Sequence, residues 1–157
     1  MITITIIPYE PRYRDDMLFC YLLAKDEIGK YAPDDKYRKP ALKEDLFDIE
    51  KSYFQQGDVF YLAIDESDRV VGMIGTQIIS PTGLWLKRLF IKPGQKGKGI
   101  GGKLLLKVEE FAAQKGITTI HTRFANWYHE AAVFYPAKGF AEVESSKDYL
   151  RCMMKKL

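Results

Sequence analysis

The sequence predicts an α+β fold in a single domain that spans residues 1–157. Two observations support this. The spacing of apolar residues changes along the chain between the two-residue period of strands and the longer period of helices, and a glycine-rich segment joins one strand to one helix. The 46% hydrophobic and 13% aromatic content is that of a packed protein. We expect a mixed, mostly antiparallel sheet of about seven strands flanked by about four helices.

The N-terminal part of the chain is expected to form one strand and two helices. Residues 1–7 alternate between apolar and polar side chains and stop before a proline, which is typical of a strand rather than a signal peptide. Residues 11–28 and 40–57 carry apolar side chains at helical spacing, and a glycine is placed to end the second segment. The polar stretch 29–39 separates the two predicted helices.

The middle of the chain changes from helical to extended spacing. Residues 59–64 and 69–79 predict an antiparallel hairpin, and residues 84–91 form the next strand. Residues 100–115 place their apolar side chains on one face of a helix, and residues 117–124 form the following strand. A strand, a helix and a strand in this order predict two parallel neighbouring strands.

The C-terminal part of the chain predicts a short helix and a last hairpin. The helix spans roughly residues 128–138 and ends at a glycine, and residues 140–144 and 149–155 can pair as antiparallel strands. The chain has no internal repeat and no low-complexity segment.

The segment from Lys96 to Gly102, with the sequence KGKGIGG, lies at the junction of the strand 84–91 and the helix that follows it. Glycine lets the main chain come close to an anion, and the N–H groups at a helix N-terminus attract negative charge. The segment therefore predicts a phosphate-binding loop. A flexible surface turn that needs glycines is the alternative.

Two known phosphate motifs overlap this loop only in part. The G-x-G-x-x-G pattern of dinucleotide-binding folds lies five residues after the strand, and the next strand has Thr122 and Arg123 where an acidic ribose ligand is expected. The P-loop pattern requires a hydroxyl residue after its lysine, but Leu104 stands there. These departures argue against a nicotinamide site and against a nucleoside triphosphate site.

A third pattern explains more of the sequence. The strand LKRLFIKP at residues 86–93, the loop KGKGIG at residues 96–101 and the segment FYPAKGF at residues 134–140 resemble the GNAT superfamily of acyl-CoA-dependent acetyltransferases. In that family the loop binds the pyrophosphate of coenzyme A through main-chain N–H groups, and the strand before it contacts the pantetheine arm. The resemblance is strong in the second half of the chain.

The resemblance implies an acetyltransferase that moves an acetyl group from acetyl-CoA to a primary amine of a small molecule or peptide. The amine attacks the thioester directly, and Tyr135 matches the family's tyrosine acid. No metal is implied. The residues expected to bind the cofactor are Leu89, Phe90, Ile91, Lys96, Gly97, Lys98, Gly99, Ile100, Gly101, Gly102, Asn126 and Lys138. A non-catalytic acyl-CoA-binding or regulatory module of the same fold is the alternative.

The chain departs from the family pattern at three places. Lys96 replaces the usual glutamine or arginine at the start of the loop, and Tyr128 replaces an asparagine seven residues before the tyrosine, with Asn126 two residues earlier. The strand 84–91 lacks the glutamate that many members use as a base. The base is left open between a water chain and an acidic side chain from the candidate acceptor wall: Asp34, Asp35, Glu44, Asp45 or Asp48.

Charge, cysteines and hydropathy restrict the partners. The formal net charge of +3 is too small to argue for nucleic acid binding, and no apolar run approaches the ~20 residues that span a bilayer. Cys20 and Cys152 lie far apart without a metal-ligand pattern, as expected of free thiols in a cytoplasmic protein. A homodimer formed through the last strands is compatible with the sequence.

Overall fold

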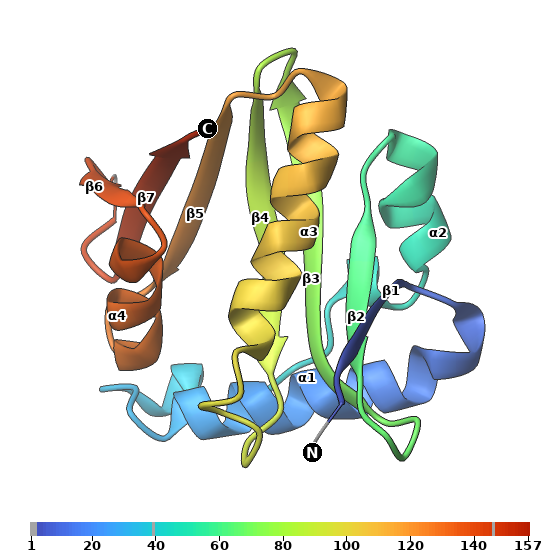
Figure 1. The fold of residues 1–157 in the computed structure, drawn as a ribbon. Helices are drawn as coiled ribbons and strands as arrows, with labels where there is room; N and C mark the ends of the chain where they lie inside the picture. The colour runs from blue at the N-terminus through green and yellow to red at the C-terminus, as the bar shows by residue number, and fades with distance from the viewer. Residues whose placement is uncertain (1–2, 39, 146) are drawn as a thin grey trace.

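The computed structural model describes residues 3–38, 40–145 and 147–157. It has a seven-stranded sheet with the order β1-β2-β3-β4-β5-β7-β6 (Figure 1). Every neighbouring pair is antiparallel except β4 and β5, which are parallel. The predicted fold class is confirmed. The strands are β1 (Thr5–Pro8), β2 (Phe60–Ile64), β3 (Val70–Ser80), β4 (Gly83–Ile91), β5 (Thr119–Ala125), β6 (Ala141–Val143) and β7 (Leu150–Lys156).

Helices cover both faces of the sheet. Helix α3 (Ile100–Lys115) lies on one face, over β2, β3 and β4, and α1 (Arg14–Gly29) crosses the opposite face (Figure 1). Helix α4 (His129–Ala137) follows β5. The apolar face of α3 is buried as its spacing predicts, and a left-handed glycine, Gly116, ends the helix. No helix among the described residues is both long enough and apolar enough to cross a bilayer.

The continuous helix expected over residues 40–57 is not formed. The segment consists of short turns around the four-residue helix α2 (Ile49–Ser52), with 3-10 turns at Glu44–Leu46 and Phe54–Gln56. Asp48 interrupts the path because its side chain caps α2, accepting a hydrogen bond from the N–H of Lys51 at 3.0 Å. Of the four apolar side chains at helical spacing, Leu46, Ile49 and Tyr53 are buried, whereas Leu42 is exposed.

The sheet forks between β4 and β5. These strands pair only over Gly83–Trp85 and Thr119–His121, and beyond this point they diverge (Figure 1). Strand β4 continues along β3, whereas β5 continues along β7. The fork therefore opens toward the carboxyl ends of both strands, beside the loop that leads into α3. In open sheets, ligands bind at the carboxyl ends of parallel strands where the neighbours separate.

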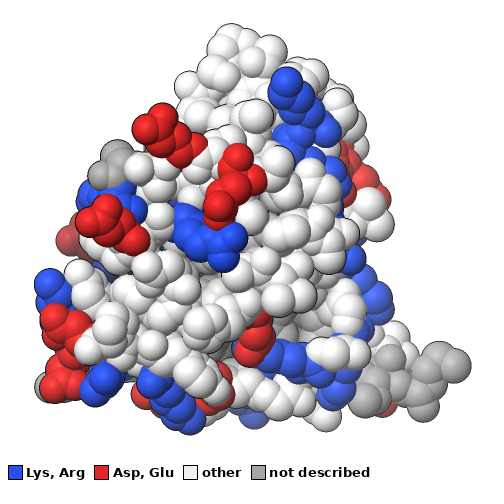
Figure 2. Space-filling model, turned by 90° about the vertical axis from the view of Figure 1, so that its left-hand side faces the viewer, with Lys and Arg blue, Asp and Glu red and all other residues white. Residues whose placement is uncertain are grey.

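Basic and acidic side chains are interspersed on the face formed by β6, β7 and α4 (Figure 2). Arg151 of β7, for example, forms an ion pair with Glu142 of β6. Among the described residues, this face therefore carries no continuous basic patch of the kind that binds nucleic acid.

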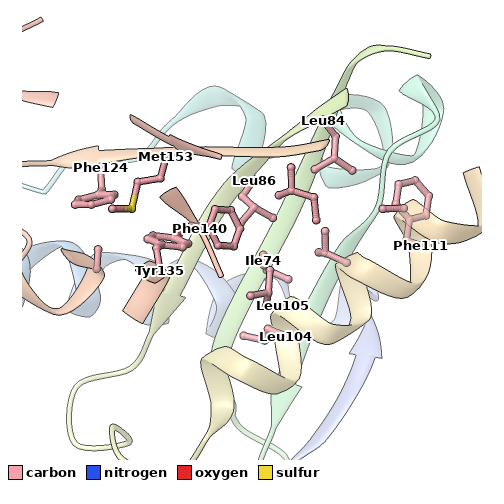
Figure 3. Close-up of a cluster of buried hydrophobic side chains, with 14 of the residues drawn as sticks. Ile74, Leu84, Leu86, Leu104, Leu105, Phe111, Phe124, Tyr135, Phe140 and Met153 are labelled. Atoms are coloured by element: carbon pink, nitrogen blue, oxygen red, sulfur yellow. The ribbon is translucent and has the colours of Figure 1, made fainter. Parts of the chain in front are cut away.

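One buried apolar cluster fills the space between α3, the fork and α4. It includes Leu84 and Leu86 of β4 and Leu104 of α3, and it extends to Tyr135 of α4 (Figure 3). Helix α3 comes close to β3 because Gly72 has no side chain: a Cβ there would lie 2.9 Å from Cγ2 of Ile100. The cluster thus fixes both the start of α3 and the ring of Tyr135.

Candidate active site

A cavity of about 630 Å³ lies on the α3 side of the fork. Its walls come from the end of β4, the loop before α3, the first turn of α3, and α4. Ten of the residues predicted from the sequence line it: Leu89, Ile91, Lys96, Gly97, Gly99, Ile100, Gly101, Gly102, Tyr135 and Lys138. The structure therefore brings together a loop and a tyrosine that are far apart in sequence.

The N-terminus of α3 forms one end of this cavity. Gly99 caps the helix with φ 74° and has no side chain to accept a hydrogen bond, so the first N–H groups of α3 lack a capping side chain. Gly97 also has positive φ, and a Cβ at either glycine would meet no atom within 4 Å. Free N–H groups, the positive end of the helix dipole and open space suit a phosphate group.

Two lysines border the same end. Lys96 forms an ion pair with Glu130 of α4, which also lines the cavity. The Nζ of Lys138 lies 3.1 Å from the position that a Cβ on Gly102 would take, so it reaches the first turn of α3. Lys138 adds positive charge beside the N–H groups, whereas Glu130 balances the charge of Lys96.

Tyr135 lies at the deep end of the cavity, in the fork. It is only 6% exposed, and its ring packs against Phe124 and Phe140 with centroid distances of 5.5 and 5.2 Å (Figure 3). Burial raises the pKa of the Tyr135 phenol to about 12, although a hydrogen bond with Thr122 acts in the opposite direction. The hydroxyl is therefore protonated throughout the neutral pH range.

A second cavity, of about 350 Å³, lies on the other side of the fork. Its walls include α1, the β4 segment from Leu86 to Phe90 and the β5 segment from Thr122 to Ala125. Leu89, Tyr128 and Tyr135 line both cavities, so the two cavities meet at the fork.

A β-bulge in β4 shapes the wall of the second cavity. Met73 pairs with Phe90 and Gly75 with Lys87, so two residues of β4 oppose one residue of β3. Arg88, in the bulge, has a φ of 57°, which is uncommon for a residue other than glycine.

The carboxylate of Asp45 holds the bulged arginine in place. It accepts hydrogen bonds from Arg88 Nε at 3.0 Å and Arg88 Nη2 at 2.7 Å, and a third from the Tyr53 hydroxyl at 2.6 Å. Burial raises the pKa of Asp45, but these hydrogen bonds outweigh it and leave the pKa below its usual value. Asp45 is therefore ionised and paired, which does not suit a general base.

The main chain of β4 also offers a hydrogen-bond donor to the fork. The N–H of Lys92 donates to the carbonyl oxygen of Val71 at 2.9 Å, toward β3. Because successive N–H groups of a regular strand point in opposite directions, that of Ile91 points away from β3, toward the fork.

Three of the residues predicted to bind the cofactor do not line the first cavity. Phe90 points to the α1 side, where it packs edge-to-face with Tyr21. The Nζ of Lys98 donates to Gln95 Oε1 at 2.9 Å, and the side-chain amide of Asn126 donates to the carbonyl oxygen of Asp148 at 3.2 Å. We therefore leave these three side chains out of the site.

Sequence reasoning missed other lining residues. Glu130 and Phe134 of α4 line the first cavity, and Tyr128, at the usual asparagine position, lines both cavities. Sequence reasoning also missed four cationic residues that line the second cavity: Lys25, Lys87, Arg88 and Arg123. Helical spacing in residues 128–138 could have found the α4 residues, whereas no local pattern indicates the cations.

Comparisons with known proteins agree with this geometry. Residues 56–142 match the family described as Acetyltransferase (GNAT) domain. The probable N-acetyltransferase camello of Xenopus laevis is 30% identical over 121 residues, which cover 76% of this chain and 55% of that protein. Thialysine N-epsilon-acetyltransferase of Bos taurus is 29% identical over 66 residues, covering 42% of this chain and 39% of that protein. The chain thus spans about half the length of the first of these relatives, and less of the second.

Solved structures share the fold over the whole chain. A GNAT-family acetyltransferase from Staphylococcus aureus superimposes with a TM-score of 0.85 at 25% identity, covering 99% of both chains. The PaiA N-acetyltransferase of Thermoplasma acidophilum, solved in complex with coenzyme A, has the same TM-score at 22% identity and also covers 99% of both chains.

Proposed function

Because the chain belongs to the GNAT acetyltransferase family, we propose that it transfers an acetyl group from acetyl-CoA to a primary amine. One observation carries the proposal: the two cavities meet in the fork of the sheet, beside the hydroxyl-bearing ring of Tyr135. A donor bound in one cavity and an acceptor bound in the other would bring their reacting groups together at this point.

The first cavity fits acetyl-CoA. The N–H groups at the start of α3 and the lysines Lys96 and Lys138 would hold the pyrophosphate, and the free edge of β4 would hydrogen-bond the pantetheine arm. Acetyl-CoA would supply the acetyl group as a reactive thioester. The Thermoplasma neighbour was solved in complex with coenzyme A, which supports this assignment.

The residues at the fork suit direct transfer. The amine nitrogen bonds to the thioester carbonyl carbon, the carbon–sulfur bond breaks, the sulfur takes a proton, and the nitrogen loses its surplus proton to water. A main-chain N–H of β4 near Leu89, which lines the cavity, would donate to the carbonyl oxygen, where negative charge develops. Because no described Asp or Glu lines the second cavity, water is the proton acceptor we propose.

Tyr135 is the proposed donor to the departing sulfur. With a pKa of about 12, its hydroxyl is a much weaker acid than a thiol, whose ordinary pKa is about 8.5. The hydroxyl therefore stabilises the sulfur by donating a hydrogen bond as the carbon–sulfur bond breaks, and solvent restores any proton that it gives up.

The test combines binding with turnover. Calorimetric titration with acetyl-CoA should show stoichiometric binding, and a panel of primary amines should release free thiol only in the presence of the protein. Binding without thiol release from any amine would favour a non-catalytic acyl-CoA-binding module of the same fold. Absence of binding would reject the donor assignment.

A further inference from the structure

Four cationic residues from three elements line the second cavity. Lys25 comes from α1, Lys87 and Arg88 from β4, and Arg123 from β5. The Nζ of Lys25 lies 5.8 Å from the ring centroid of Phe90, which places this cation against β4. Lys87 and Arg88 lie at the β-bulge, where the regular alternation of side chains along β4 is interrupted.

The positive charge of this cavity is largely uncompensated. Within residues 3–38, 40–145 and 147–157, neither Lys25, Lys87 nor Arg123 forms an ion pair, and no Asp or Glu lines the cavity. Only Arg88 is paired, through Nε and Nη2, with Asp45.

Burial and the positive charge of the cavity lower the pKa of its two lysines. Burial lowers the pKa of Lys25 and of Lys87, and the nearby guanidinium of Arg88 lowers both further.

Aromatic rings form another wall of the cavity. The ring of Tyr37 lies 5.0 Å from that of Trp127 and 5.7 Å from that of Tyr149, measured between centroids. All three line the cavity. Such a surface packs against an apolar or aromatic group, while the cations at β4 and α1 attract an anion.

From this arrangement, and resting on the proposed function, we infer that the acceptor is an amine that also carries a carboxylate and an apolar or aromatic body. Amino acids belong to this class. The carboxylate would bind between Lys25 and Lys87, the body would pack on the aromatic wall, and the amine would face the fork at Tyr135. Polyamines carry several positive charges and no anion, so the cavity would repel them.

The same charge helps the amine to react. An ammonium group in a cationic, partly buried cavity is disfavoured relative to the neutral amine, and only the neutral amine has the lone pair needed for attack. A cavity without a carboxylate base can therefore still hold the acceptor in its reactive form.

The experiment compares amines that differ only in the carboxylate: phenylalanine with phenethylamine, and lysine with cadaverine. We expect the carboxylate-bearing member of at least one pair to have a kcat/KM at least about tenfold higher, with spermidine the poorest substrate. In Lys25→Gln and Lys87→Gln this preference should fall about tenfold through a higher KM. Lys51→Gln is the matched control, because Lys51 is exposed on α2 and outside the cavity.

Two further measurements separate the possible failures. Calorimetry with acetyl-CoA, run on every variant, reports both folding and the donor site; loss of binding in the parent chain would reject the proposed function itself. If acetyl-CoA binds but amines without a carboxylate are used equally well or better, the inference alone is overturned. If no amine in the panel reacts, binding of N-acetylphenylalanine that weakens about tenfold in Lys25→Gln supports the inference, and absence of binding overturns it.

Discussion

Gly99 and Gly116 cap the two ends of α3 with nearly the same backbone conformation, at φ 74° and 73°. A Cβ added at either position would meet no atom within 4 Å. Alanine at either site therefore costs only the left-handed backbone conformation, about 1–2 kcal/mol of unfolding free energy. For a domain of this size the expected fall in Tm is roughly 2–8 °C.

The two glycines differ in what lies beside them. Gly99 lines the first cavity, next to the free N–H groups of α3, whereas Gly116 lies at the far end of the helix. A methyl group at position 99 would occupy space proposed for the pyrophosphate. We expect Gly99→Ala to raise the Kd for acetyl-CoA at least tenfold, which is about 1.4 kcal/mol. Gly116→Ala should leave the Kd unchanged within about twofold.

Thermal unfolding without ligand measures the first effect, and calorimetric titration measures the second. Equal losses of Tm together with unequal losses of affinity would show that Gly99→Ala weakens acetyl-CoA binding by disturbing the ligand site and not by destabilising the fold. Equal acetyl-CoA affinity in the two variants would refute the assignment of the loop as the pyrophosphate site.

Three other changes test the remaining parts of the site. Tyr135→Phe should lower kcat about a hundredfold while the Kd for acetyl-CoA stays within about twofold, as steady-state kinetics and calorimetry would show; the reverse pattern would remove the tyrosine as the donor. Asp45→Asn should lower the unfolding free energy by about 2 kcal/mol at pH 7 because it breaks a half-buried ion pair with Arg88. Since the pKa of Asp45 is depressed in the folded state, the difference in unfolding free energy between the two proteins should persist above pH ~4. It should vanish as the pH falls through the folded pKa. Urea titrations that show no such pH dependence would contradict the pairing. Gly72→Ala should lower the free energy of unfolding by about 1–3 kcal/mol and weaken acetyl-CoA binding, because its methyl group would push on Ile100 at the start of α3. Thermal unfolding and calorimetry measure these two effects, and an unchanged Tm with an unchanged Kd would contradict the prediction.

Local sequence patterns predicted the elements around the first cavity well. The helical spacing of residues 100–115 and the glycines before it determine α3 and its open N-terminus within one segment, so neither depends on distant contacts. The parallel pairing of β4 with β5 followed from the strand–helix–strand order. Residues 40–57 failed as a helix because one side chain, Asp48, made a local cap that periodicity does not detect.

The second cavity, where we propose that the acceptor binds, could not be predicted in the same way. Lys25, Lys87 and Arg123 come from three elements, and each alone has the appearance of an ordinary surface cation in the sequence. They line one cavity because the sheet forks between β4 and β5. The shape of β4 there also depends on the ion pair between Arg88 and Asp45, which lie in distant segments of the chain. The position of Asn126 in the sequence pointed to the cofactor, whereas in the structure its side-chain amide donates a hydrogen bond to the main-chain carbonyl oxygen of Asp148.

A single-turnover experiment tests the central claim most directly. The protein is mixed with acetyl-CoA labelled in the acetyl group and with excess phenylalanine or lysine, and the label is followed by mass spectrometry. Direct transfer at the fork predicts that the label moves to the amine, that free thiol appears at the same rate, and that no label accumulates on the protein. Label that stays on acetyl-CoA with these and all other amines tested, or that first appears on the protein, would contradict the account.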